Sequence, residues 1–375
     1  MYRLDESKIK VLYIAETSLS NKSAYSQHVI KMCDAFGQKK CSLTLVVPYE
    51  KNNFRFKNIK NRFLLNSKKP FLIKSILNSK IKNFFSRFEF AIKASIFTKS
   101  QRPSLIVTRS LLSSFCLSIL RIPHFLEIHN EIKSFSKFLF LGLNYINSKY
   151  IIKIILISNA LKKKFNLNKK KVMILHDGSD PTNFKKSKKI NKIKNATYVG
   201  SFYQGRGIDL IYFLAKKFKH INFKLYGNNN KNYKSNLKNL KIFKFVEYNK
   251  VPSILASSDL LLMPYEKKVF IRAKNINTAD YCSPLKMFDY LASGKIIISS
   301  NLNGISEVIK NGYNGYLVNN FNMYSWEKKI NEIIKKTKRN HMIQTNALNT
   351  AEKYSWNNRV KKIIIEYKKN IYNYL

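Results

Sequence analysis

Acidic residues are scarce in this sequence. It contains 21 Asp and Glu against 69 Lys and Arg over 375 residues, a formal net charge of +48. Only 11 of the basic residues are Arg, and the Lys excess accompanies abundant Ile, Asn, Phe and Tyr, so part of it reflects genome composition. The shortage of acids has no such explanation. A field this positive favours polyanionic partners, namely nucleic acid, an anionic membrane surface or phosphorylated substrates.

Cysteine is also rare, and long apolar runs are missing. The four cysteines (Cys33, Cys41, Cys116 and Cys282) form no C-x-x-C pair. They fit neither a zinc site nor a disulfide framework, and they favour a reducing compartment. The N-terminus lacks the apolar core of a signal peptide, and no apolar stretch is long and uninterrupted enough to span a bilayer. We therefore expect a cytoplasmic protein, with peripheral binding at the inner face of the cytoplasmic membrane as an option.

Glycine is nearly absent from the first half of the chain. None precedes Gly37, and nine of the 11 glycines lie at Gly178 or later. A G-x-G-x-x-G turn after the first apolar run is therefore excluded. Such a turn brings the backbone close to a dinucleotide pyrophosphate, so an N-terminal NAD or FAD site is excluded with it.

Apolar residues are plentiful, at 45% of the chain, and the length suits two domains. Short β-rich runs alternate with longer helical patterns, which is typical of doubly wound parallel sheets. The runs are 11–14, 43–47, 105–107, 125–128, 154–157 and 172–175, then 196–199, 223–226, 260–263, 296–298 and 315–318. We predict an α/β protein of two Rossmann-like domains facing a cleft. Their predicted bounds are 1–180 and 181–350, with a terminal helix over 351–375 that returns toward the first domain.

The segment 198–211, YVGSFYQGRGIDLI, is the strongest candidate for a site. It predicts a strand, a loop and then a helix. Gly200, Gly205 and Gly207 would let backbone N–H groups approach an anion, and Arg206 could clamp it with charge-assisted hydrogen bonds. The alternative is a tight strand-to-helix turn with a surface Arg, and this segment alone favours neither.

A second candidate is the segment 281–294, YCSPLKMFDYLASG. Ser283 is predicted to be the N-cap of a helix and Pro284 its first residue. The free N–H groups and the positive dipole end at such a start suit a diphosphate. Asp289 lies in this helix, where its carboxylate could hold a pair of ribose hydroxyls, and Gly294 ends it. Alone, the segment favours a capped structural helix; together with the glycine loop it favours an anion site.

Further motifs accompany these two segments along the chain. They are Glu127-Ile-His129, the segment 174–184 (ILHDGSDPTNF), the segment 257–265 (SSDLLLMPY), the segment 305–309 (ISEVI) and Tyr354-Ser-Trp356. In this order the motifs resemble those of the retaining family-four glycosyltransferases of the GT-B fold, over nearly the whole chain. The loop 200–207 matches the family's Gly-Arg-Leu-x-x-Glu-Lys-Gly, and 284–294 matches its Pro-Leu-Lys-x-x-Glu-Tyr-x-Ala-x-Gly.

The resemblance implies that the C-terminal domain binds a nucleotide-diphosphate sugar and the N-terminal domain binds the acceptor. It implies no metal and no cofactor other than this co-substrate. Contacts with the donor are expected from Gly200, Ser201, Gly207, Ser283, Pro284, Leu285, Lys286 and Asp289, and catalytic roles from His129, Arg206 and Asp280. Arg206 and the helix start would bind the diphosphate, and His129 would contact the sugar in an oxocarbenium-like transition state. The acceptor is expected to be a glycan or a lipid-linked acceptor, in bacterial surface polysaccharide or lipopolysaccharide synthesis.

Three positions depart from the family pattern. Ser201 stands where the family usually has Arg, so Arg206 is expected to carry more of the diphosphate charge. Tyr281 stands at the first acid of the family's Glu-x7-Glu, and the adjacent Asp280 could replace it through a one-residue shift. The loop 18–24 lacks the family's glycine pair. An inactive relative of the family is therefore a second hypothesis, and a buried structural histidine is the alternative for His129.

The segment 51–100 is the most basic part of the chain, with 13 Lys and Arg against the single acid Glu89. Six apolar residues fall there at helical spacing and predict one apolar stripe: Ile73, Leu77, Ile81, Phe84, Phe88 and Ile92. Flanking basic residues are Lys74, Lys80, Lys82, Arg87 and Lys93. The stripe fits an ordinary domain helix or docking on anionic lipid equally well. A specific nucleic-acid partner is not expected, because the sequence has no zinc-finger spacing, RNA-binding motif or recognition helix.

Overall fold

The structure, a computed structural model, describes most of the chain. The described residues are 6–20, 23–50, 56–132, 134–165, 167–185, 187–228, 233–270, 276–319 and 322–370. Residues 21–22 of the loop 18–24, residues 51–55 of the basic segment and residues 371–375 of the expected terminal helix therefore lie outside the described residues.

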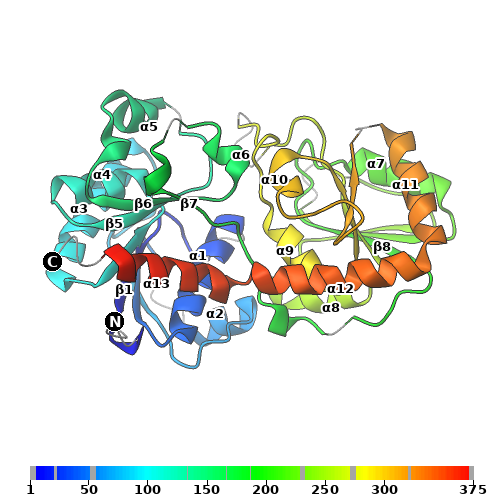
Figure 1. Cartoon of the computed structure of the whole chain (residues 1–375), viewed down its shortest axis with the longest axis horizontal. Helices are drawn as coiled ribbons and strands as arrows, with labels where there is room; N and C mark the ends of the chain where they lie inside the picture. Colours follow the sequence, from blue (N-terminus) through cyan, green and yellow to red (C-terminus); the bar gives the residue numbers. More distant parts are fainter. Residues whose placement is uncertain are drawn as a thin grey trace. The chain divides into compact units, whose positions relative to one another are not determined.

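The chain forms two compact units (Figure 1). Unit 1 contains Met1–Ile157, Leu161–His176 and Trp356–Leu375, and unit 2 contains Ser158–Ala160 and Asp177–Ser355. The chain therefore returns to unit 1 after completing unit 2.

The described part of unit 1 forms a seven-stranded sheet in which all neighbouring strands are parallel. Its order is β3 (Leu72–Ser75), β2 (Ser42–Val47), β1 (Lys10–Ile14), β4 (Leu105–Thr108), β5 (His124–Ile128), β6 (Ile151–Leu156) and β7 (Val172–Ile174). The central strands are almost entirely buried, as expected for a parallel sheet covered on both faces.

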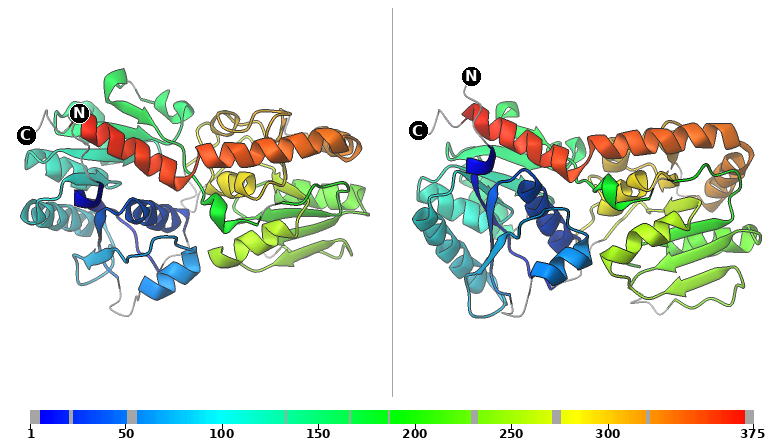
Figure 2. Two further views of the ribbon diagram at one scale, coloured as in Figure 1. Left: turned by 60° about the horizontal axis from the view of Figure 1, so that its bottom comes forward. Right: turned by 90° about the horizontal axis from the view of Figure 1, so that it is seen from below.

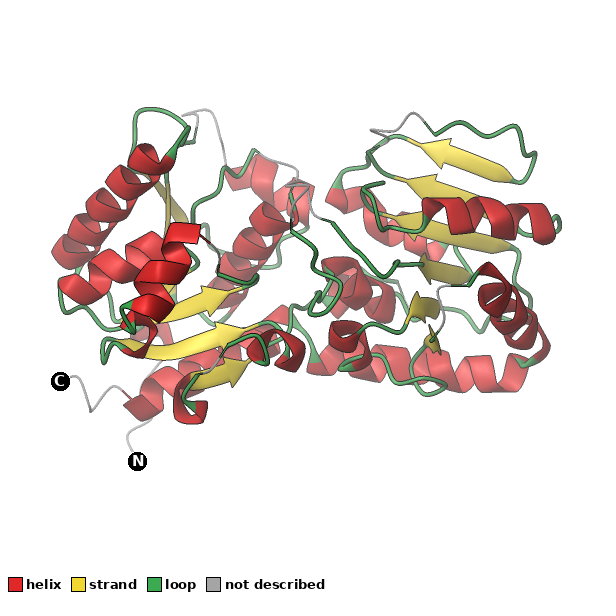
Figure 3. Ribbon diagram, turned by 90° about the horizontal axis from the view of Figure 1, so that it is seen from above, coloured by secondary structure: helices red, strands yellow, loops and turns green. Residues whose placement is uncertain are grey.

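Helices cover this sheet (Figure 3). They are α1 (Ala24–Gln38), α2 (Phe56–Phe63), α3 (Phe84–Gln101), α4 (Leu111–Ile119), α5 (Ser134–Lys137) and α13 (Trp356–Asn370). The short helix α6 (Asn159–Lys162) is divided between the two units after Ala160. Helix α13 packs against α1, as both views of Figure 2 show. Within the described residues, no helix is both long and apolar enough to cross a membrane.

In unit 2 the described residues form a six-stranded parallel sheet. Its order is β10 (Leu240–Phe243), β9 (Asn222–Tyr226), β8 (Asn195–Val199), β11 (Leu260–Met263), β12 (Ile296–Ser300) and β13 (Tyr316–Val318). The helices of this unit are α7 (Ile208–Lys217), α8 (Val251–Ala256), α9 (Leu285–Ala292), α10 (Asn303–Ser306), α11 (Met323–Lys335) and α12 (Thr337–Lys353). The predicted α/β class with two Rossmann-like sheets is confirmed.

Each sheet has one point at which the strand order reverses direction. In unit 1 it lies between β1 and β4, and in unit 2 between β8 and β11. Ligands of open α/β sheets bind outside the carboxyl ends of the strands at such a switch point. The loops that follow these four strands are therefore where each unit is expected to bind a ligand.

The helix predicted across 73–92 is wrong in its first half. Ile73 lies in β3, paired with Leu45 of β2, and Leu77 is buried in the following loop. The helix α3 begins only at Phe84, where Asn83 and Ser86 form a capping box. The helical spacing arises by coincidence, because Ile73, a partly buried strand residue, and Leu77, a buried loop residue, precede an amphipathic helix.

Candidate functional site

The loop between β8 and α7 carries the glycines expected at a site. Gly200, Gly205 and Gly207 have φ angles of 148°, 84° and 65°. A Cβ at Gly205 would collide with the carbonyl of Lys268, and one at Gly207 with that of Pro264. These two glycines therefore let the loop pack directly on the segment that follows β11. The close approach is between two parts of the protein backbone.

Two side chains of helix α9, one turn apart, contact the end of β8. The hydroxyl of Tyr290 accepts a 2.9 Å hydrogen bond from the Val199 N–H. Lys286, four residues earlier, points toward the same strand end, and its Nζ lies 3.8 Å from the centroid of the Tyr198 ring. A Cβ at Gly200 would collide with this Nζ, so the glycine provides the space that the ammonium group occupies.

Arg206 brings a second cation to the same place. Its Cζ lies 5.1 Å from the centroid of the Tyr265 ring, and its Nη2 donates a 3.2 Å hydrogen bond to the Phe270 carbonyl. Lys286 Nζ lies 5.9 Å from the same ring centroid. The two cations therefore share Tyr265, which follows β11 at the switch point of the sheet.

Neither cation is neutralised by an acid among the described residues. Lys286 Nζ and Arg206 Nε are buried and have no hydrogen-bond partner in the described part of the chain. Burial, and then the positive charge of Arg206, hold the pKa of Lys286 well below its usual value. Burying an unpaired cation costs several kcal/mol, roughly. A bound anion would remove this cost, so the pair has the properties of an anion-binding site.

The start of α9 differs from the prediction. The N-cap is Pro284, with extended backbone and no side-chain cap, and the first helical residue is Leu285. Ser283 therefore lies one residue too early to cap the helix, and its buried Oγ has no hydrogen-bond partner among the described residues. The first N–H groups of α9 have no intrahelical acceptor, as at any helix start. They add donors and a positive dipole end beside Lys286.

Asp289 is buried, at 6% exposure, one turn further along α9. Its Oδ1 accepts a 2.9 Å hydrogen bond from the hydroxyl of Tyr248. Burial, and then the charges of Asp289 and Asp180, raise the pKa of Tyr248 well above its usual value, so this hydroxyl stays a donor. A carboxylate has about four lone-pair sites, of which Tyr248 uses one. The tyrosine fixes the orientation of the carboxylate.

The side chains of the remaining donor-side candidates, Ser201 and Asp280, are less buried. Ser201 contributes its backbone carbonyl, which accepts a 2.8 Å hydrogen bond from the Tyr198 hydroxyl. Asp280 is exposed on the turn that precedes α9. Its neighbour Tyr281 is buried in the core, and the Tyr281 carbonyl accepts a 3.1 Å hydrogen bond from Ser158.

His129 belongs to unit 1 and follows β5. Its Nε2 lies 2.6 Å from Oε1 of Glu127, a fully buried carboxylate. Burial, and then the charge of Arg109, lower the pKa of His129 to about 3, so the ring is neutral near pH 7. Because the carboxylate can only accept, Nε2 carries the proton and Nδ1 is left as an acceptor.

Glu127 is the centre of a polar cluster in unit 1. The same Oε1 lies 2.8 Å from His28 Nε2 and 2.5 Å from Arg359 Nη2, while Oε2 accepts a 2.8 Å hydrogen bond from Tyr13. Burial raises the pKa of Glu127, but the interactions with His28 and Arg359 outweigh it and hold this pKa well below its usual range. Glu127 is therefore a carboxylate throughout the neutral pH range.

The same cluster offers the ligand types of a metal site. Atoms of His28, Glu127 and His129 lie within 4.8 Å of one another. However, Arg359 already binds the shared carboxylate oxygen, and a divalent cation there would meet the guanidinium charge at close range. The cluster therefore fits an ion-pair hub better than a metal centre.

Unit 2 thus brings together Gly200, Arg206 and Lys286, three of the residues predicted from the sequence. Ser283 directly precedes the N-cap of α9, and Asp289 lies within this helix. Four aromatic residues that hold these side chains could not be recognised from the sequence: Tyr198, Tyr248, Tyr265 and Tyr290. Tyr198 lies near the end of one β-rich run and Tyr265 lies two residues after another, and this was the available signal. Their role depends on β8 and β11 being neighbours, which is not visible in the sequence.

Comparisons with known proteins agree with this fold. Residues 179–350 match the family described as Glycosyl transferases group 1. An uncharacterized glycosyltransferase of Methanocaldococcus jannaschii is 23% identical over 231 residues, covering 57% of this chain and 59% of that protein. The matched part therefore spans less than two thirds of that relative.

Several solved structures are similar over almost the whole chain. A glycosyltransferase from Rickettsia africae has 15% identity and a TM-score of 0.72, covering 98% of this chain and 100% of that one. HepE from Anabaena, solved with UDP and glucose, has 15% identity and a TM-score of 0.68, covering 95% and 99%. At such identities the likeness shows the fold, which is GT-B-like. The resemblance inferred from the sequence motifs is confirmed: residues 179–350 match the glycosyl transferases group 1 family, and the two Rossmann-like units have a GT-B-like fold.

Proposed function

We propose that this protein is a retaining glycosyltransferase that uses a nucleotide-diphosphate sugar, bound by unit 2, and an acceptor bound by unit 1. The supporting observation is the pair of buried, unneutralised cations, Arg206 and Lys286, at the switch point of the second sheet. A diphosphate supplies the missing negative charge. HepE, a structural neighbour, was solved with UDP-glucose, which fits a ligand of this class.

In this proposal each donor-side residue binds one part of the ligand. Arg206, Lys286 and the N–H groups at the start of α9 bind the diphosphate in place of a metal ion. The Ser283 hydroxyl donates to a phosphate oxygen, and Gly200 and Gly207 keep the loop close enough for contact. Asp289, oriented by Tyr248, accepts hydrogen bonds from the ribose hydroxyls.

The chemical step breaks the bond between the sugar C1 and the diphosphate oxygen. The electron pair leaves with the diphosphate, where the two cations stabilise the developing charge. An acceptor oxygen bonds to C1 on the same face and passes its proton to the leaving diphosphate oxygen, so the configuration is retained. In this proposal, Nδ1 of neutral His129 accepts a hydrogen bond from a hydroxyl of the donor sugar. Asp280, on the exposed turn before α9, is proposed to assist the same step.

The acceptor proposed from the sequence is a glycan or a lipid-linked acceptor of a bacterial surface polysaccharide or lipopolysaccharide. One structural neighbour is the lipopolysaccharide outer core galactosyltransferase WaaB, at 14% identity and a TM-score of 0.66. That neighbour supports the class of acceptor without specifying the sugar.

The test of the donor site is calorimetric titration with UDP, GDP, ADP and CMP and their sugars. We expect one nucleotide to bind, and Lys286→Ala and Arg206→Ala each to weaken it by about tenfold or more, the usual worth of a charge-assisted contact. The control is Lys329→Ala, because Lys329 already pairs with Glu332 on α11. Absence of binding by every nucleotide would contradict the proposal. An active enzyme should slowly release UDP, or the nucleoside diphosphate of whichever donor binds, from the sugar nucleotide. An inactive relative should bind the nucleotide without releasing it from its sugar.

A second proposal concerns the membrane, because α3 exposes an apolar face. Phe85 and Ile96 are 80% and 58% exposed, and Phe84, Phe88 and Ile92 are exposed on the same helix. Exposed Lys80 and Lys82 precede them. Exposed aromatic and aliphatic residues beside lysines suit an anionic lipid surface. We therefore propose that α3 docks unit 1 on the membrane.

Sedimentation with vesicles of anionic lipid tests this surface. Phe85→Ser with Ile96→Ser should reduce binding more than Lys216→Glu with Lys219→Glu, which reverses exposed charge in unit 2. Equal losses would mean that only diffuse charge drives binding, and the α3 proposal would be dropped.

A further inference from the structure

Unit 1 has a polar network of its own at its switch point. It is built by the segments that follow β1 and β4, which are neighbouring strands. Glu16 follows β1, and Arg109 and Ser110 follow β4. The Arg109 N–H donates a 3.0 Å hydrogen bond to the Ile14 carbonyl, which fixes the two strand ends side by side.

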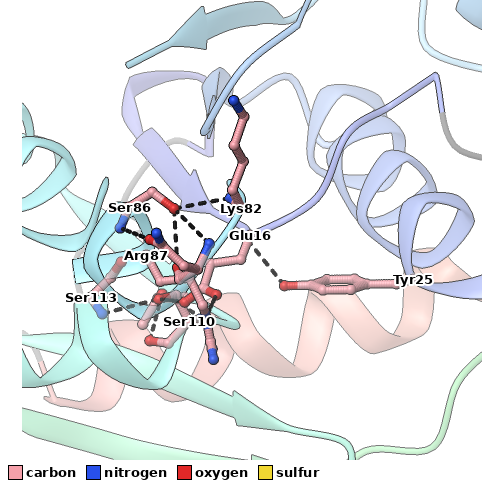
Figure 4. A network of polar contacts seen from close by, with 9 residues as sticks. Glu16, Tyr25, Lys82, Ser86, Arg87, Ser110 and Ser113 are labelled. Carbon is pink, nitrogen blue, oxygen red and sulfur yellow. Dashed lines mark hydrogen bonds and ion pairs between the residues drawn. The ribbon is translucent and has the colours of Figure 1, made fainter. Parts of the chain in front are cut away.

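Glu16 is the centre of this network (Figure 4). Its Oε1 accepts a 2.5 Å hydrogen bond from the Ser110 hydroxyl, and its Oε2 lies 2.7 Å from Arg87 Nε. The Glu16 N–H donates a 3.2 Å hydrogen bond to the Tyr25 hydroxyl, which reaches in from α1. The negative charge of Glu16 is therefore balanced by Arg87, a residue of α3.

Arg109 is the cation that this network leaves unbalanced. Its Cζ lies 4.0 Å from the centroid of the Tyr25 ring. Its Nη1 is buried without a hydrogen-bond partner, and no acid pairs with the guanidinium, within the residues that the structure describes. Glu127 has Arg359 and Glu16 has Arg87, so each carboxylate of these two clusters already holds its own cation.

The surrounding backbone adds to the positive field. Helix α4 starts directly after Arg109, with Ser110 as its N-cap accepting a 3.0 Å hydrogen bond from the Ser113 N–H. The positive end of the α4 dipole therefore lies beside the unpaired guanidinium. The field also reaches His129, where Arg109 contributes to the lowered pKa.

We propose that Arg109 binds an anionic oxygen group, a phosphate or a carboxylate, carried by the acceptor substrate. Taking the ligand to be the acceptor rests on the proposed function; the anion site itself rests on the unbalanced charge. Tyr25 flanks the guanidinium, and its hydroxyl, which accepts from the Glu16 N–H, can donate a hydrogen bond to a neighbouring hydroxyl of a sugar. The substrate class is thus an anionic saccharide, either phosphorylated or of the uronic acid type.

Arginine side-chain NMR tests this proposal with a separate signal for each site. The chain has 11 arginines, so ¹⁵N-arginine labelling gives a small set of Nε–H resonances. Arg109→Lys, Arg206→Lys and Arg87→Lys assign three of them. The full-length protein is titrated with inorganic phosphate, glucuronate, glucose and UDP.

We expect phosphate or glucuronate to shift the Arg109 resonance, while neutral glucose leaves it unchanged. Whichever of the two binds more tightly identifies the acceptor group. UDP should shift Arg206 and leave Arg109 in place. Paired Arg87 is the internal control. If the Arg109 resonance does not shift at phosphate concentrations that saturate the Arg206 resonance, the inference is wrong. A shift of the Arg109 resonance on addition of UDP would also contradict it. A failure of UDP to move Arg206 contradicts the donor site instead, so the two failures are distinguishable.

A second measurement uses the stabilisation that a bound anion gives. With UDP at saturation, phosphate should raise the melting temperature of the wild type, and Arg109→Gln should weaken this phosphate binding by about tenfold or more. The matched control is Arg121→Gln, which removes an exposed arginine from the turn before β5 in the same unit. Equal stabilisation of both variants would show that the anion binds elsewhere.

Discussion

Lys286 and Tyr198 form a cation–π contact in which Nζ lies 3.8 Å from the ring centroid. Such a contact contributes about 2 kcal/mol when it is desolvated. Burying an unpaired ammonium group costs several kcal/mol, roughly. The tyrosine therefore holds the cation in place without compensating its charge. This imbalance is the basis of the donor-site proposal, and it can be measured.

Lys286→Met should separate stability from ligand binding. Removing a buried, unpaired charge is expected to leave unit 2 equally stable or to stabilise it by roughly 1–4 kcal/mol, as in other replacements of buried charges by apolar side chains. The added stability that a nucleotide gives the wild type should fall sharply. Trp326 lies in unit 2 and Trp356 in unit 1, so Trp326 fluorescence in a Trp356→Phe background follows unit 2 alone. Lys329→Met is the control, and a destabilised Lys286→Met variant that still binds nucleotide would contradict the argument.

Gly200→Ala should displace the ammonium group. A Cβ there would collide with Lys286 Nζ, and the φ of 148° is one that L-residues rarely adopt. We expect a loss of roughly 1–3 kcal/mol from backbone strain, together with weaker nucleotide binding. In Gly200→Ala with Lys286→Ala the collision is absent, so the double variant should lose less stability than the sum of the single variants. Additive losses, measured by urea unfolding, would show that the glycine does not act through Lys286.

Glu127→Gln should destabilise unit 1 more than a surface substitution. The neutral amide leaves the buried Arg359 without its carboxylate, and breaking a buried pair in this way costs about 3–5 kcal/mol. Glu127→Gln with Arg359→Met should recover part of this loss, because no unpaired charge remains. Trp356 fluorescence in a Trp326→Phe background measures the effect. Full additivity of the two substitutions would count against the pairing.

Acid should weaken unit 1 through His124. Burial lowers its pKa from an ordinary value near 6.5 to about 4. Between these values the unfolded chain binds a proton that the folded protein does not. The stability that neutral His124 provides is therefore complete above about pH 6.5 and is lost as the pH falls toward 4. This slope amounts to about 1.4 kcal/mol per pH unit for one proton.

The variant His124→Gln tests that slope. Glutamine keeps a donor and an acceptor for the Ile122 carbonyl and the Ser114 hydroxyl, which lie 2.9 and 2.7 Å from the imidazole nitrogens. We expect lower stability at pH 7 and a shallower loss of stability between pH 6.5 and 4. His220→Gln, at an exposed position of unit 2, is the control. An unchanged slope in His124→Gln would assign the acid sensitivity to other groups.

The motif residues differ in how well their roles could be read from the chain. The sequence identifies both Arg206 and Lys286 as candidate donor-site residues. It does not show that both lie near the ring of Tyr265 or that neither has an acid partner. Ser283 was assigned a capping role because Ser-Pro is a common helix start, and the structure moves the cap to Pro284. Because of this shift of one residue, the Ser283 hydroxyl does not bond to the helix N–H groups and is available to form a hydrogen bond with a ligand.

The sequence by itself determined the class of fold, the family resemblance and the two segments that are proposed to carry the donor site. It could do so because strand periodicity, helix spacing and glycine positions are local properties of the chain. The tertiary structure alone decided which charges are compensated. Glu16 is balanced by Arg87 and Glu127 by Arg359, residues far away in the sequence, and Arg109, Arg206 and Lys286 are left without acids in the described residues. Charge compensation depends on distance and burial, and these arise only when strands from distant segments become neighbours.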